Sequence, residues 1–104
     1  MDNLIEHSGP GIYRLIGELD ASNVADVDAV LESGMPLAED LTLDLSELTF
    51  VDSMGISLFA SLAQKLEGRG ELILFAPDHS VRKILELVGL HDRPNVRISG
   101  PPSE

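Results

Sequence analysis

Segments with strand-like and helix-like patterns alternate along this chain, and the alternation limits its fold more than any other feature. Residues 12–19 carry the β-branched and aromatic side chains typical of a strand, and leucines alternate with polar residues over 41–45. Apolar residues recur at helical spacing after each of these strands, first over 24–31 and then along a longer helix that ends near Glu67. Strands separated by helices of this length pair in parallel through right-handed crossovers.

The remaining segments complete the same alternation. They are an edge strand at 4–7, a turn at 46–49, a strand at 72–75, a helix whose apolar stripe is Val81, Ile84, Leu85 and Val88, and a final strand at 95–99. Because residues 72–75 are apolar on both faces, we expect a central strand covered by helices. The sequence predicts an α/β fold with a mixed sheet of four or five strands and three helices. It forms a single domain over residues 1–99, followed by a short disordered tail over 100–104.

The net charge of the chain limits the classes of partner that it can bind. Its 104 residues include 18 acidic and 7 basic side chains, which gives a net charge of −11. The basic residues are scattered, so the field of the protein repels nucleic-acid phosphates and anionic membranes. The N-terminal residues lack the pattern of a secretory signal, and no apolar run approaches the ~20 residues that span a bilayer. We expect a soluble cytoplasmic protein that binds neither nucleic acid nor membrane.

The inventory of reactive residues argues against an enzyme with a metal or a cofactor. The chain has no cysteine, which excludes thiol catalysis, disulfides and zinc-finger sites. Its three histidines, His7, His79 and His91, are too far apart in sequence to form a local metal pair. The glycine pair around Arg69 precedes a strand and lacks the third glycine of a dinucleotide site. We predict no metal, no cofactor and no enzymatic activity.

One serine stands where a functional side chain is often found, at the turn between a strand and a helix. Ser53 stands at a strand-to-helix turn, between Asp52 and the pair Met54-Gly55. In one interpretation, Asp52 or Ser53 only caps the helix by accepting a hydrogen bond from a free amide. In a second, Ser53 is a hydrolase nucleophile, although Val51 occupies the place of the first glycine in the required motif. In the third, Ser53 is phosphorylated, because helix N-terminal amides and the helix dipole favour an anion and Gly55 keeps the approach free of a side chain.

A second loop, over residues 19–23, also follows a strand and precedes a helix. The functional loops of a parallel sheet lie at the carboxyl ends of its strands. We therefore expect Asp20 to lie near Ser53, although the two residues are distant in sequence. The alternative is that Asp20, Ser22 or Asn23 only caps the helix that follows.

The helix after Ser53 has one predicted buried stripe. A helix turns roughly 100° per residue, so the residues that face the sheet are Ile56, Phe59, Leu62, Ala63 and Leu66. Met54 and Leu58 point away from the centre of this stripe. Because apolar anchors carry much of the binding energy at interfaces, we predict that these two side chains form a partner-facing patch next to Ser53.

Three stretches of the chain share residues and spacing with a known family. They are Gly17-Glu18-Leu19-Asp20, the segment from Leu43 to Gly55 that ends in Asp52-Ser53-Met54-Gly55, and the segment from Val81 to Leu90. Together they resemble the STAS domains of bacterial anti-sigma factor antagonists. The resemblance implies that an anti-sigma factor with serine kinase activity phosphorylates Ser53, and that a phosphatase removes the phosphate. It further implies that the unphosphorylated form binds the anti-sigma factor and frees the sigma factor, and that Asp20 borders the phosphorylation site.

These arguments together predict a set of partner-binding residues, with Ser53 as the phosphorylation site. The set is Asp20, Asp52, Ser53, Met54, Gly55 and Leu58. The chain departs from the family at Met54, where many members have serine or threonine. STAS domains also serve in lipid-transport and stress-signalling complexes, so the alternative function is a constitutive subunit of such a complex, in which Ser53 is only a helix cap.

A second departure concerns the end of the chain. Family members often have a further helix after the last strand, and this sequence stops at residue 104 without one. We expect the missing C-terminal helix to leave core surface exposed, or covered by a partner or a second copy. The sequence thus leaves open whether the protein forms a homo-oligomer.

Overall fold

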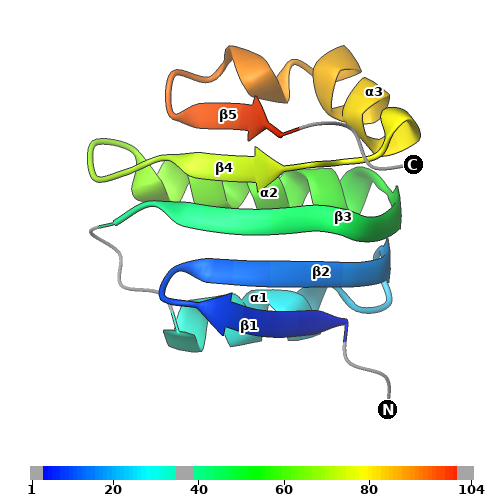
Figure 1. Cartoon of the computed structure of the whole chain (residues 1–104), viewed down its shortest axis with the longest axis horizontal. Coiled ribbons are helices and arrows are strands. Elements are labelled where there is room, and N and C mark those ends of the chain that lie inside the picture. The colour runs from blue at the N-terminus through cyan, green and yellow to red at the C-terminus, as the bar shows by residue number, and fades with distance from the viewer. Residues whose placement is uncertain (1–3, 35–38, 101–104) are drawn as a thin grey trace.

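The computed structural model describes residues 4–34 and 39–100. In chain order, its elements are β1 (Ile5–Gly9), β2 (Ile12–Leu19), α1 (Val24–Gly34), β3 (Leu41–Val51), α2 (Ser53–Leu66), β4 (Leu72–Phe75), α3 (His79–Leu87), the 3₁₀ turn η1 (Leu90–Asp92) and β5 (Val96–Ser99). The predicted α/β fold, with its mixed sheet and three helices, is confirmed (Figure 1). The predicted tail lies outside the described residues except for Gly100.

The five described strands form one sheet in the order β1-β2-β3-β4-β5. Strand β1 is antiparallel to β2, and the other neighbours are parallel. Successive parallel strands advance in one direction across the sheet, so right-handed crossovers place their connecting helices on the same face. Figure 1 shows α1 and α2 lying side by side behind the sheet.

The core lies between the sheet and these helices. Leucines at alternate positions of the inner strands, such as Leu43 and Leu74, are fully buried against Phe59 and Leu62 of α2. The other face of the sheet is partly open, because Phe75 keeps 40% of its surface exposed. The prediction that helices cover β4 on both faces is therefore wrong: its apolar residues on the open face are only partly covered.

Strand β3 is longer than predicted, because it continues through residues 46–49, where a turn was expected. The pairing of β2 with β3 shifts twice, and at each shift β3 has one extra residue. The hydroxyl of Thr49 donates a hydrogen bond to the carbonyl oxygen of Gly17 in the bulged part. As a result, the polar residues of this segment fit into a strand, and β3 ends level with β2, at the pair Leu19 and Val51.

The buried stripes of α2 and α3 differ from the predicted ones at a few residues. In α3, Val81 and Leu85 are buried as expected, but Val88 lies at the C-cap and keeps 54% of its surface exposed. In α2, Ile56 is only partly buried, whereas Leu58 is buried. No helix in the described ranges is both long enough and apolar enough to span a membrane.

Candidate partner-binding site

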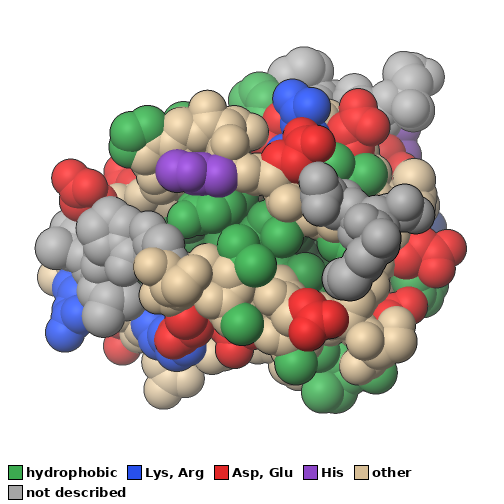
Figure 2. All heavy atoms as spheres, turned by 90° about the horizontal axis from the view of Figure 1, so that it is seen from below, with side chains coloured by type: hydrophobic (Ala, Val, Ile, Leu, Met, Phe, Trp, Pro, Cys, Tyr) green, Lys and Arg blue, Asp and Glu red, His purple; other side chains and the backbone are tan. Residues whose placement is uncertain are grey.

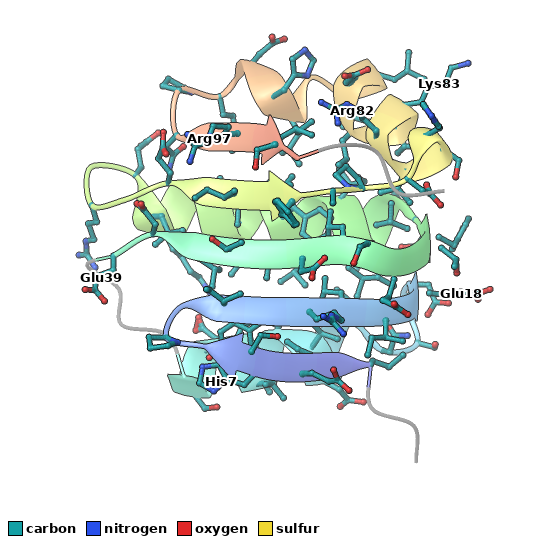
Figure 3. The ribbon with its side chains drawn as sticks, viewed as in Figure 1. His7, Glu18, Glu39, Arg82, Lys83 and Arg97 are labelled. Atoms are coloured by element: carbon teal, nitrogen blue, oxygen red, sulfur yellow. The ribbon has the colours of Figure 1, made fainter. Side chains whose placement is uncertain are left out.

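The two loops singled out in the sequence lie side by side at the carboxyl edge of the sheet. Because β2 and β3 end level, the Asp52 amide can donate to the Leu19 carbonyl oxygen at 3.1 Å. The Ala21 amide in turn donates to Oδ2 of Asp52 at 3.2 Å. Figure 3 shows Glu18 at this edge and Glu39 at the opposite one. The prediction that the loops of Asp20 and Ser53 share one edge is confirmed.

Asp52 is the N-cap of α2. Its backbone is extended, with φ −101° and ψ −173°, and Oδ1 accepts hydrogen bonds from the amides of Met54 at 2.9 Å and Gly55 at 3.1 Å. One carboxylate therefore holds two free amides of the helix and, through Oδ2, the neighbouring loop. The interpretation that Asp52 or Ser53 caps the helix is confirmed for Asp52, and the Ser53 side chain takes no part in the cap.

Ser53 is the first residue of α2, and its side chain is exposed. Its hydroxyl forms no hydrogen bond with any residue in the described part of the chain. Met54 beside it is also exposed, with 47% of its surface accessible. The site thus presents a free hydroxyl next to an apolar side chain, on a helix end that Asp52 holds in place.

The side chain of Asp20 forms hydrogen bonds within the loop that precedes α1. Its Oδ1 accepts hydrogen bonds from the amide of Ser22 at 2.9 Å and from the Ser22 hydroxyl at 2.6 Å. Its amide donates to Oδ1 of Asn23, whose side-chain nitrogen donates to the Glu18 carbonyl oxygen. These side chains shape the turn before α1, and no described hydrogen bond joins the Asp20 carboxylate to Ser53.

Two of the predicted contact residues are buried. A Cβ on Gly55 would lie 2.5 Å from Cγ2 of Val51 and 3.0 Å from Cδ2 of Leu19. Gly55 therefore lets α2 begin close against the strand ends, and it does not keep the approach to Ser53 free as expected. Leu58 has only 6% of its surface exposed, so the expected exposed patch of Met54 and Leu58 reduces to Met54.

The burial of Leu58 results from the packing of α1 beside α2. A groove of about 210 Å³ lies between these helices, and its walls are Val24, Ala25, Asp28, Met54, Ser57, Leu58 and Ser61. The groove was not predicted from the sequence, although residues 24 and 28 and residues 54, 57, 58 and 61 recur at the spacing of one helix face. We call it the α1–α2 groove.

The far end of the two helices is joined by an ion pair. Nζ of Lys65 donates a hydrogen bond to Oε1 of Glu32. This hydrogen bond, with the charges of Glu32 and Asp28, raises the pKa of Lys65 above its usual value. The ion pair therefore links the two helices beyond the α1–α2 groove.

Replacing Asp52 with alanine is expected to lower the free energy of unfolding by about 1–2 kcal/mol, the usual loss for an N-cap. The change removes both hydrogen bonds to the α2 amides and the one to Ala21. Urea denaturation measures the effect. Asp52→Asn should retain most of the stability, because asparagine caps helices about as well. Equal stability of the alanine variant and the wild type would contradict this role.

Comparison with known proteins identifies the family. Residues 3–99 match the family model of the STAS domain. The anti-sigma-B factor antagonists of Listeria monocytogenes and Listeria innocua are each 33% identical to the chain over 79 residues, which is 73% of this chain and 68% of theirs.

Solved structures agree with this assignment. The anti-sigma factor antagonist SpoIIAA in its unphosphorylated form matches with a TM-score of 0.60 at 25% identity, over 80% of each chain. The phosphorylated form of SpoIIAA, a Bacillus cell fate determinant, matches with 0.63 at 25% identity, over 91% of this chain and 88% of that one. A candidate antagonist from Thermotoga maritima shares the fold, with 0.73 at 18% identity over 91% and 84%. The chain therefore belongs to the STAS domain family, among its anti-sigma factor antagonists.

Proposed function

We propose that this protein is an anti-sigma factor antagonist controlled by phosphorylation of Ser53. The unphosphorylated form binds an anti-sigma factor with serine kinase activity and thereby releases a sigma factor in the cytoplasm. The kinase then phosphorylates Ser53, binding is lost, and a phosphatase restores the first state. The observation that carries this proposal is the exposed hydroxyl of Ser53, which has no structural task at the start of α2.

The surroundings of Ser53 favour a switch that acts through charge. Phosphorylation adds ~1.5–2 negative charges at neutral pH. The amides of Met54 and Gly55 already donate to Asp52, so they are not free to neutralise a phosphate as the sequence suggested. The helix dipole remains favourable, but the carboxylates of Asp52 and the Asp20 loop add repulsion. A phosphate at Ser53 thus leaves a strongly negative surface that a docked partner must desolvate.

The partner contacts follow from what is exposed at this edge. Met54 offers an apolar contact beside Ser53, and the loop of Asp20 offers polar ones. Gly55 and Leu58 are buried and contribute to binding indirectly, because their packing fixes the position of α2 on the sheet and against α1. In this proposal the protein acts by binding and performs no catalysis of its own.

We expect the kinase-type anti-sigma factor of the source organism, incubated with ATP, to add one phosphate to this protein at Ser53. Peptide sequencing by mass spectrometry locates the phosphate. Ser53→Ala should abolish the modification, whereas the matched change Ser57→Ala, one helical turn further along α2, should leave it intact. Phosphate on Ser57 or Ser61, with Ser53 unmodified, would overturn the assignment.

A further inference from the structure

The α1–α2 groove extends from the switch serine along the helix pair. Met54, adjacent to Ser53, and Ser57 are part of its wall on α2, while Val24 and Ala25 belong to the first turn of α1. The pair of Lys65 with Glu32 joins the helices at the other end. A partner that covers Ser53 and Met54 therefore meets the groove directly.

One oxygen in this groove lacks a partner. Asp28 contributes to the wall, and its Oδ1 is buried without a hydrogen bond from any residue in the described ranges. Buried carboxylate oxygens normally accept a hydrogen bond, since leaving one unpaired costs free energy. The nearby amine of Lys65 donates to Glu32 instead. The groove thus contains an acceptor for a donor that the described chain does not supply.

The charges around the groove determine which donor suits it. The chain has a net charge of −11, and Figure 2 shows acidic side chains at several places on the face seen from the β1 side, with basic side chains beside some of them. The basic side chains labelled in Figure 3 lie on α3 and β5, at the other end of the strand order from α1. The basic group near Asp28 is the Lys65 amine, which is already engaged by Glu32, so a basic side chain of a partner could supply the missing donor.

We propose that the α1–α2 groove receives a basic side chain of the anti-sigma factor, an arginine in preference to a lysine. The aliphatic stem would contact Val24, Met54 and Leu58, and the guanidinium would donate to Asp28. Arginine suits the site because its several donors can reach the carboxylate and the hydroxyls of Ser57 and Ser61 together. This inference rests on the proposed function, since it names a contact of the same partner.

The test compares two variants of α1 that remove the same charge. Asp28→Asn should weaken binding of the anti-sigma factor about tenfold to a hundredfold, because a charge-assisted hydrogen bond is lost. Asp26→Asn, at an exposed position outside the groove, should change affinity less than about twofold. Isothermal titration calorimetry gives both values. The thermal midpoint of Asp28→Asn should stay within a few degrees of the wild type, because Oδ1 of Asp28 accepts no hydrogen bond inside the described chain.

A second readout separates this inference from the proposed function. In NMR titrations, a short peptide with one arginine should shift the amide signals of Asp28, Ser57 and Ser61 more than the same peptide with neutral citrulline. Equal effects of the two peptides, or equal affinities of the Asp28 and Asp26 variants for the anti-sigma factor, would overturn the inference and leave the function standing. If the wild type does not bind the anti-sigma factor while the arginine peptide still selects the groove, the proposed function fails alone.

Discussion

Replacing Gly55 with alanine is expected to lower the free energy of unfolding by about 2–3 kcal/mol, the range found when a packed site is overfilled. The added Cβ would lie 2.5 Å from Cγ2 of Val51 and 3.0 Å from two atoms of Leu19, and both side chains are buried. Alanine favours a helix over glycine by about 1 kcal/mol, which offsets only part of this clash. The thermal midpoint should fall by roughly 10–20 °C for a domain of this size.

The same substitution at Gly9 is the matched control. A Cβ there meets only Cδ1 of Ile12, at 3.8 Å, which is an ordinary contact. Gly9→Ala should therefore leave the thermal midpoint within a few degrees of the wild type. If Gly55→Ala were as stable as the wild type, the close packing of α2 on the strand ends would be wrong.

Gly55 also shows why the fold was easier to predict than the site. Elements follow from periodicity along the chain, so β2 was predicted with its observed bounds and α2 nearly so. The extension of β3 through residues 46–49 was missed, because a bulge depends on pairing with β2 rather than on local residue types. Likewise, the burial of Gly55 depends on two strand ends that are distant from each other in sequence.

For the candidate site too, some features could be predicted from the sequence and others could not. That Asp20 and Ser53 share an edge followed from topology, since both loops leave the carboxyl ends of neighbouring parallel strands. The burial of Leu58 did not follow, because the periodicity of α2 shows which residues face the sheet but not which residues face α1. Helix α1 packs on α2 and covers Leu58, and the same packing creates the α1–α2 groove with Asp28 in its wall.

Phosphorylation of Ser53 is expected to weaken binding of the anti-sigma factor more than a hundredfold, equivalent to about 3 kcal/mol of binding free energy. The phosphate would add bulk and charge at the start of α2, where the amides of Met54 and Gly55 are already engaged by Asp52. We expect the block to be local, because the hydroxyl of Ser53 contributes no hydrogen bond within the described fold.

Two variants of Ser53 distinguish the effect of added charge on binding from the effect of losing the hydroxyl. Ser53→Ala should bind about as tightly as the wild type, because the hydroxyl is exposed and unbonded among the described residues. Ser53→Asp introduces one charge instead of nearly two and no phosphate bulk, so its affinity should fall about tenfold or more but less than that of the phosphorylated protein. Calorimetric titration gives the affinities, and circular dichroism should show thermal midpoints within a few degrees of each other. If phosphorylation instead lowered the midpoint substantially, or if the aspartate variant bound as tightly as the alanine variant, a local electrostatic switch at Ser53 would be the wrong mechanism.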